Sequence, residues 1–175
     1  MNSHPEKCLL FSEQEIALAI DRLAAEISRD YQGKSPVFLG ILKGVFIFMA
    51  DLVRRLEIPL EIEFVRLSSY GSGRETSGKV EIVNDLTCSL EGRDVLVVED
   101  IIDSGLTTAF LLEYLQKQSV ASLKLCTLMD KPSRREVQVK IDYLGLTVPD
   151  EFLIGYGLDC DQQYRNLPDI WILED

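Results

Sequence analysis

Histidine and paired cysteines are nearly absent from this sequence, which argues against several kinds of site. The single histidine, His4, lies next to the amino terminus, so we expect neither a Ser–His catalytic pair nor a multi-histidine zinc site. The four cysteines are scattered without a CxxC pair, which indicates reduced thiols rather than a disulfide framework. Any acid–base chemistry is therefore expected from Asp, Glu, Lys or Tyr side chains.

Positive charge is also scarce. The chain has 18 Lys plus Arg against 29 Asp plus Glu, a formal net charge of −11. Nucleic acids and anionic membranes both need a basic face, so this balance argues against either as the main partner. An anionic substrate would need cations placed locally around it.

Long apolar runs are missing as well. No stretch approaches the roughly 18 apolar residues of a membrane span. Residues 1–15 lack the basic-then-apolar pattern of a secretory signal, so we expect a cytoplasmic protein. With 175 residues, 46% hydrophobic and 27% charged, the chain is expected to form one globular domain over residues 1–175.

Helical and strand patterns alternate along most of the chain. A capping-box spacing of Ser12 and Glu15 begins a helix that Gly33 and Pro36 end. Further helices are predicted over residues 45–56 and 107–117, and strands over 37–42, 60–67, 95–98, 122–129, 141–146, 152–156 and 170–173. The alternation predicts an α/β fold with a mostly parallel central sheet flanked by helices, and a small lobe from about residue 145 to 175.

Residues 68–79 differ in composition from their surroundings. They contain three glycines, four serines and one threonine, so they bury little and predict a mobile loop. Two interpretations stay open, a surface hairpin or a lid that closes over a site with Tyr70 near its tip.

Residues 95–108, VLVVEDIIDSGLTT, predict a site. The apolar run Val95–Val98 is typical of a strand buried on both faces, and Glu99 and Asp100 follow it directly. Ligands of open α/β sheets bind beyond the carboxyl ends of the strands. The turn at 103–107 can bind one phosphate group through Gly105, two hydroxyls and a helix amino terminus. Neither GxxxxGK[ST] nor GxGxxG after a strand occurs, which argues against a P-loop or a dinucleotide site.

These residues carry a family resemblance. VLVVEDIIDSGLTT resembles the phosphoribosyl pyrophosphate motif of type I phosphoribosyltransferases, and the chain is most similar to their hypoxanthine-guanine branch. The supporting segments are residues 39–44, Ser69-Tyr70, 130–132, 152–159 and 164–167. The family commonly has Thr where this chain has Ser104, which keeps the hydroxyl. The resemblance covers nearly the whole chain and implies that the small lobe is a hood built from the chain termini.

The resemblance implies distinct roles within the central motif. Glu99 and Asp100 would bind the ribose hydroxyls and Mg²⁺, an ion that prefers oxygen ligands. Asp103 would be the general base, acting at the purine nitrogen N7. The 5′-phosphate would contact Asp103, Ser104, Gly105, Leu106 and Thr107. Judged alone, the paired acids could instead be a solvated strand edge, and Asp103 could be a helix N-cap.

The resemblance also places the other substrate groups. Pyrophosphate would contact Lys43, Gly44, Arg165, Ser69 and Tyr70, and the Leu42–Lys43 peptide would be cis. The purine would contact Lys131, Phe152, Leu153 and Asp159, with Asp159 also a metal ligand. From sequence alone, Arg165 could be a surface arginine, Lys131 a solvated loop lysine and Phe152 a core residue.

The implied reaction is Mg²⁺-dependent transfer of the phosphoribosyl group from phosphoribosyl pyrophosphate to hypoxanthine or guanine, by a homo-oligomer (dimer or tetramer). Lysine has donors and no acceptor, so Lys131 should reject the 6-amino group of adenine. Xanthine stays open, because its 2-oxo group would meet only a backbone carbonyl and water. Two other hypotheses are an RNA-binding regulator on the same fold, which the net charge disfavours, and a phosphoribosyltransferase for another base.

Overall fold

The computed structural model describes residues 6–70, 79–83 and 86–174, and its largest element is a six-stranded sheet. The strand order is β4-β3-β2-β5-β6-β7. The bounds are β2 Val37–Leu42, β3 Glu61–Tyr70, β4 Lys79–Ile82, β5 Asp94–Ile102, β6 Ser122–Asp130 and β7 Tyr143–Thr147. All neighbouring strands pair in parallel except β4, which is antiparallel to β3 at one edge.

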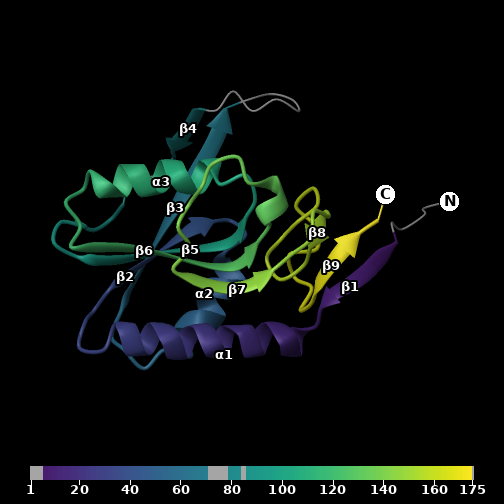
Figure 1. Ribbon diagram of the computed structural model, residues 1–175, viewed down its shortest axis with the longest axis horizontal. Coiled ribbons are helices and arrows are strands. Elements are labelled where there is room, and N and C mark those ends of the chain that lie inside the picture. Colours follow the sequence, from purple (N-terminus) through teal and green to yellow (C-terminus); the bar gives the residue numbers. More distant parts are fainter. Residues whose placement is uncertain (1–5, 71–78, 84–85, 175) are drawn as a thin grey trace.

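Three helices cover the two faces of this sheet (Figure 1). Helices α1 (Glu13–Asp30) and α2 (Phe46–Val53) pack on one face, and α3 (Leu106–Gln116) packs on the other. The sheet interior is dry because Val95, Leu96, Val97 and Val98 are 0% exposed, as an apolar run without alternation requires. The predicted α/β fold with a mostly parallel sheet is confirmed.

The predicted start of the first helix is also confirmed. Ser12 caps α1: its side chain accepts from the Glu15 amide, and the Glu15 carboxylate accepts from the Ser12 amide. Helix α3 begins at Leu106 and ends at Gln116, one residue earlier at each end than the pattern predicts. A single turn, η1 (Pro132–Arg134), follows β6.

A second, three-stranded antiparallel sheet forms a small lobe from both ends of the chain. Its order is β1-β9-β8, with bounds β1 Lys7–Phe11, β8 Leu153–Ile154 and β9 Ile170–Leu173. Figure 1 shows this sheet beside the central one, with β1 and β9 side by side. The resemblance implied this hood, but no sequence pattern predicted β1, because its five residues lack a clear alternation.

The predicted strand ends differ from the observed ones at two places that bear on function. Strand β5 continues to Ile102, so Glu99 and Asp100 belong to the strand rather than following it. Strand β3 runs to Tyr70 and β4 begins at Lys79; the rest of the predicted loop, residues 71–78, lies outside the described residues. Within the described ranges, no helix combines the length and apolarity needed to cross a membrane.

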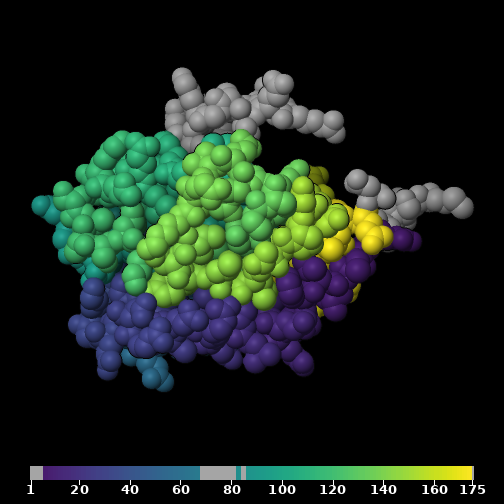
Figure 2. All heavy atoms as spheres, in the orientation of Figure 1, coloured from purple at the N-terminus to yellow at the C-terminus, as the bar shows by residue number. Residues whose placement is uncertain are grey.

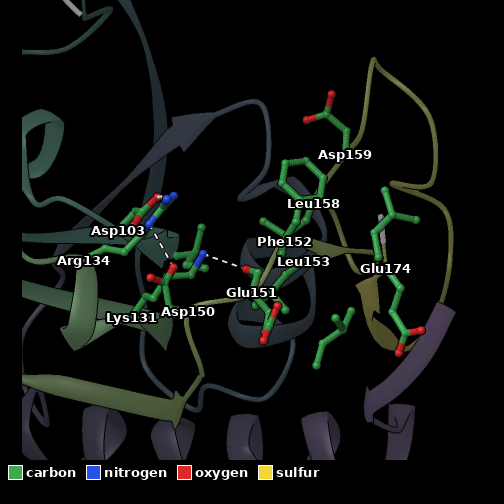
Figure 3. Close-up of a pocket in the computed structure, with 13 residues that line it drawn as sticks. Asp103, Lys131, Arg134, Asp150, Glu151, Phe152, Leu153, Leu158, Asp159 and Glu174 are labelled. Carbon is green, nitrogen blue, oxygen red and sulfur yellow. Dashed lines mark hydrogen bonds and ion pairs between the residues drawn. The ribbon is translucent and has the colours of Figure 1, made fainter. Parts of the chain in front are cut away.

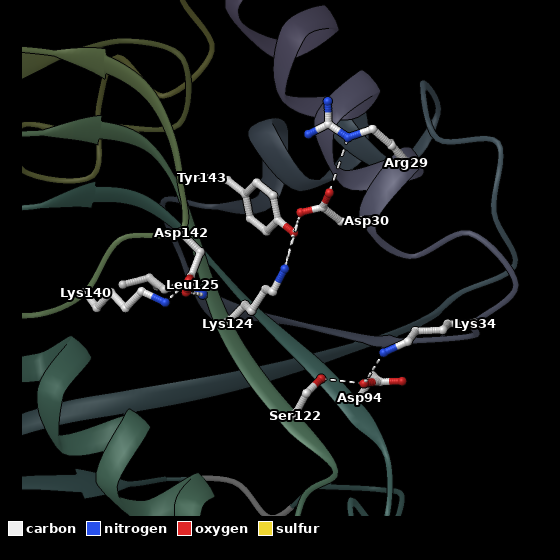
Figure 4. A network of polar contacts seen from close by, with 10 residues as sticks. All are labelled: Arg29, Asp30, Lys34, Asp94, Ser122, Lys124, Leu125, Lys140, Asp142 and Tyr143. Atoms are coloured by element: carbon white, nitrogen blue, oxygen red, sulfur yellow. Dashed lines mark hydrogen bonds and ion pairs between the residues drawn. The ribbon is translucent and has the colours of Figure 1, made fainter.

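A polar network joins the amino ends of the central strands to the end of α1 (Figure 4). The Tyr143 hydroxyl donates to Asp30 at 2.8 Å, and Lys124 donates to that hydroxyl at 2.9 Å. Lys34 forms an ion pair with Asp94 at 3.0 Å. The hydrogen bond from Tyr143 is the main cause that holds the pKa of Asp30 below its ordinary value. This network therefore contributes to stability at neutral pH.

We predict that Tyr143→Phe destabilises the protein by about 1–2 kcal/mol at pH 7, because it removes a partly buried hydrogen bond to a carboxylate. A lowered pKa stabilises the fold above the ordinary carboxyl value and is lost in acid. The difference between variant and parent should thus shrink as the pH falls below 3.8, the ordinary value for Asp30. Urea unfolding across this range measures it.

Tyr31→Phe is the matched control. The Tyr31 hydroxyl is buried and has no hydrogen-bond partner among the described residues, so its removal should leave the free energy of unfolding unchanged or slightly higher. Equal losses in the two variants would contradict the assignment of the stabilising bond to Tyr143.

Candidate active site

The loops that follow β2, β5 and β6 meet at one edge of the sheet. The three strands are neighbours and parallel, and Ile102 at the end of β5 pairs with Asp130 at the end of β6. Their carboxyl ends therefore share an edge, where ligands of open α/β sheets bind. The segment 150–159, which includes β8 of the hood, contributes to the same region.

The turn after β2 lies against a carboxylate of β5. A Cβ atom on Gly44 would lie 1.7 Å from Oδ2 of Asp100, so only glycine leaves room for this carboxylate. On the other side, a Cβ on Gly157 would lie 2.1 Å from the Gly44 carbonyl oxygen, and the φ of Gly157 is +99°. The Leu42–Lys43 peptide in this turn is cis, as predicted. Gly44 is thus held between β5 and the hood.

Glu99 and Asp100 are both buried, each 8% exposed. Burial, and then the charge of Asp100, raise the pKa of Glu99 well above its ordinary value. Burial raises the pKa of Asp100 to about 6, although backbone amides and Arg165 act in the opposite direction. The Oε2 atom of Glu99 has no hydrogen-bond partner among the described residues. A solvated strand edge is therefore the wrong interpretation of this pair.

A divalent cation fits this pair of acids. Two buried carboxylates, one with an unpartnered oxygen, are suited to a hard cation that keeps water and phosphate oxygens as its other ligands. No group of three or more His, Cys, Asp or Glu side chains that could hold a metal occurs within the described ranges. The protein would therefore supply only part of the coordination shell.

The turn of residues 103–107, called here the phosphate turn, has the predicted shape. Gly105 adopts a φ of +84°, and a Cβ there would lie 2.5 Å from the Val137 carbonyl oxygen. The Ser104 hydroxyl accepts from the Leu106 amide at 3.3 Å. Gly105 is the N-cap of α3 and makes no side-chain cap, so Asp103 is not the N-cap of this helix. The first-turn amides of α3 can therefore bind an anion.

Asp103 is held by two consecutive arginines that the sequence analysis did not single out. Arg135, 8% exposed, donates to the Asp103 carbonyl oxygen at 3.2 Å and forms an ion pair with Asp130. Nη1 of Arg134 lies 3.8 Å from Oδ2 of Asp103. The other oxygen, Oδ1, is buried and has no partner among the described residues. The side chain is 46% exposed, but its exposed part does not include Oδ1.

A pocket of about 570 Å³ lies between Asp103 and the hood (Figure 3). It brings together Asp103 and the four residues that were predicted to bind the purine, Lys131, Phe152, Leu153 and Asp159. Lys131 is 6% exposed, and its ammonium donates to the Glu151 carbonyl oxygen at 2.9 Å. Phe152 is 53% exposed, so it is not a core residue. A solvated loop lysine is likewise the wrong interpretation of Lys131.

The two cations predicted for pyrophosphate lie near one another. Lys43 donates to the side-chain oxygen of Gln162 at 3.0 Å, and Arg165 forms an ion pair with Asp159 at 2.7 Å. The Arg165 side chain is 19% exposed and also donates to the Gly157 carbonyl, so it is not a free surface arginine. Both oxygens of Asp159 have partners, because the Gln162 amide donates to the second at 2.9 Å.

Ser69 and Tyr70 complete the predicted pyrophosphate set. Their backbone belongs to the end of β3, but their side chains lie outside the described residues. Their role stays a prediction.

Comparisons with known proteins decide the family. Residues 10–161 match the family model described as phosphoribosyl transferase domain. The chain belongs to this family. It is 46% identical to the hypoxanthine-guanine phosphoribosyltransferase of Bacillus subtilis over 99% of this chain and 97% of that protein. The Staphylococcus aureus protein of the same name is 45% identical over 96% and 94% of the two chains.

Solved structures of phosphoribosyltransferases agree with this assignment. The crystal structure of a hypoxanthine phosphoribosyltransferase from Staphylococcus aureus has a TM-score of 0.92, with 45% identity over 95% of this chain and 91% of that one. A hypoxanthine-guanine phosphoribosyltransferase from Bacillus anthracis has a TM-score of 0.91, with 44% identity over 97% and 99%. The resemblance found in the sequence is confirmed at the level of the family and its hypoxanthine-guanine branch.

We predict that Asp100→Asn stabilises the metal-free phosphoribosyltransferase at pH 8. A carboxyl group whose folded pKa is raised to about 6 favours the fold at low pH, and that contribution is lost as the pH rises through this value. Asparagine cannot ionise, so the variant should gain about 2–3 kcal/mol over the parent at pH 8 and almost nothing at pH 4. Denaturant unfolding with a chelator present measures both values. An identical difference at the two pH values would contradict the burial argument.

Proposed function

We propose that this chain transfers the 5-phosphoribosyl group from phosphoribosyl pyrophosphate to hypoxanthine or guanine, with Mg²⁺, and releases IMP or GMP plus pyrophosphate. One observation carries the proposal: a single pocket brings together a buried lysine, an exposed phenylalanine and Asp103. The relatives named for this activity match nearly the whole chain.

The sugar phosphate would bind along the end of β5. The phosphate turn offers the amides of α3, the Ser104 and Thr107 hydroxyls and a glycine with positive φ. Glu99 and Asp100 would accept hydrogen bonds from the ribose hydroxyls. Lys43, the Gly44 amide and Arg165 would bind pyrophosphate, which would replace the Gln162 oxygen as the partner of Lys43.

The purine would be recognised by hydrogen bonds of fixed polarity. Lys131 donates to the Glu151 carbonyl, which holds its ammonium at the pocket, and it would also donate to the 6-oxo group. Phe152 would stack on the ring, and the Leu153 carbonyl would accept from the 2-amino group of guanine. Adenine presents a 6-amino donor to the lysine, and a buried mismatch of two donors is strongly unfavourable.

The reaction would exchange one bond at C1′ for another. Purine N9 attacks C1′ with its electron pair, and the bond from C1′ to the pyrophosphate oxygen breaks, so pyrophosphate leaves with that electron pair. The proton on N7 passes to the carboxylate of Asp103, which lines the pocket. The remaining groups act by positioning the reactants and by stabilising charge.

Mg²⁺, when bound by Glu99 and Asp100, would neutralise charge on the departing pyrophosphate. Asp159 is the third predicted ligand, and it would bind a second ion only after Arg165 turns to the pyrophosphate, because both of its oxygens have partners.

We also propose a cytoplasmic homo-oligomer, a dimer or tetramer. The exposed apolar side chains Phe46 and Ile62, 43% and 44% exposed, are candidates for its interface.

The proposal predicts product with only some bases. The protein is incubated with Mg²⁺, phosphoribosyl pyrophosphate and either hypoxanthine, guanine, xanthine, adenine or uracil, and the monophosphate is measured by chromatography. We expect product with hypoxanthine and guanine and none with adenine or uracil. Lys131→Met is the matched variant and should lose both products, because it keeps an unbranched, flexible side chain without the donors of lysine. No product from either hypoxanthine or guanine would exclude the proposed function.

If Asp103 is the general base, its loss should lower kcat and leave the affinity for phosphoribosyl pyrophosphate nearly unchanged. Asp103→Asn should lower kcat by about 100-fold or more, since an uncharged amide is too weak a base to accept the N7 proton. The Kd for phosphoribosyl pyrophosphate, measured by calorimetry, should change by only about a fewfold. If affinity fell as far as kcat, Asp103 would be part of the phosphate site and not the base.

A further inference from the structure

Arg134 is the one positively charged side chain lining the pocket, among the described residues, that has no role in the proposed function. It is the last residue of η1, after β6, and lines the pocket with Asp103 and Lys131. Its Nε atom lies 2.9 Å from Oδ1 of Asp150, and its Nη1 atom lies 3.8 Å from Oδ2 of Asp103. Figure 3 shows its guanidinium beside Asp103, with the contact to Asp150 drawn. Arg134 therefore bridges two carboxylates from different loops.

The two carboxylates belong to two different parts of the site, the phosphate turn and the purine-binding segment. Asp103 begins the phosphate turn, and Asp150 precedes Phe152 in the segment that lines the purine pocket. These loops follow β5 and β7, which are not adjacent in the sheet because β6 lies between them. Arg134 follows β6, so the link runs through the strand in the middle.

The main chain and the side chain of Asp103 are held by different arginines. Buried Arg135 donates to the Asp103 carbonyl at 3.2 Å and to the Ile102 carbonyl at 3.4 Å, so the main chain is held without Arg134. Arg134 contacts only the carboxylate, at the oxygen opposite the unpartnered Oδ1. Loss of Arg134 should thus affect the orientation of the carboxylate and leave the turn intact.

We propose that Arg134 is a positioning residue, which fixes the orientation of the Asp103 carboxylate through Oδ2 and ties this orientation to the purine-binding segment through Asp150. The inference rests on the proposed function. An ionic contact at one oxygen restricts rotation of the carboxylate, so its orientation toward the pocket is fixed.

The size of the effect follows from exposure and distance. The side chains of Arg134, Asp103 and Asp150 are 56%, 46% and 52% exposed. A contact of 3.8 Å between such groups is screened by water and is too long for a hydrogen bond. A loss of about three- to tenfold in kcat is therefore expected, far less than for Asp103→Asn.

The test compares the kinetics of Arg134→Gln with those of the parent enzyme. We expect kcat with hypoxanthine to fall about three- to tenfold, and KM for phosphoribosyl pyrophosphate to stay within about twofold. Arg134→Lys keeps the charge near Asp103 and should recover part of kcat. Arg29→Gln is the matched control: Arg29 is 75% exposed, forms one ion pair in the last turn of α1, and should leave kcat unchanged.

A double-mutant cycle tests the link through Asp150. Asp150→Asn alone should lower kcat less than Arg134→Gln does, and should cause no further loss when added to it. Additive losses, an unchanged kcat in Arg134→Gln, or an effect confined to KM for hypoxanthine would each overturn the inference. An inactive parent enzyme would instead overturn the proposed function, and the inference with it. Thermal unfolding of all variants should be unchanged, since both ion pairs are exposed.

Discussion

The contact between Gly44 and the Asp100 carboxylate is the constraint on which the rest of the site depends. Any side chain at position 44 would occupy the space of the carboxylate, and a Cβ on Gly157 of the hood would lie 2.1 Å from the Gly44 carbonyl oxygen. Three segments that are far apart in the chain therefore meet at one glycine. Because of this close approach, the turn that carries Lys43, the acids of β5 and the Asp159–Arg165 ion pair lie within one small region.

The charges at this edge of the sheet are unfavourable for the protein alone. Two buried carboxylates have raised pKa values, and Glu99 has an oxygen without a partner among the described residues. Such a pair is costly to bury unless a cation or hydrogen-bond donors bind it. The opposite edge is different, because there Tyr143, Lys124 and Asp30 form hydrogen bonds with one another. The fold is thus stabilised at the amino ends of the strands and left incomplete at their carboxyl ends, where substrates would supply the missing partners.

Much of the fold and of the candidate site was predictable, since it follows from local pattern. The apolar run Val95–Val98 predicted a buried strand, and the Ser12–Glu15 spacing predicted a capped helix. Strand β1 was not predicted because most of its residues are exposed and because it pairs with β9, a strand from the other end of the chain. Arg134 and Arg135 were not singled out either, although only Ser133 separates them from the 130–132 segment. Nothing in two adjacent arginines indicates that one is buried against Asp130 and the other bridges two loops.

The sequence by itself determined the chemistry that is available and the elements that present it. Acids at the end of an apolar strand, a glycine turn before a helix and a single terminal histidine limited the site to carboxylates, lysines, arginines and amides. Only the tertiary structure decided which groups are buried and which oxygens lack partners. Desolvation and close contact depend on atoms from distant segments, as when Glu151 holds Lys131, or when Gly44 admits the carboxylate of Asp100. Those long-range contacts bring residues of suitable chemistry together in one pocket.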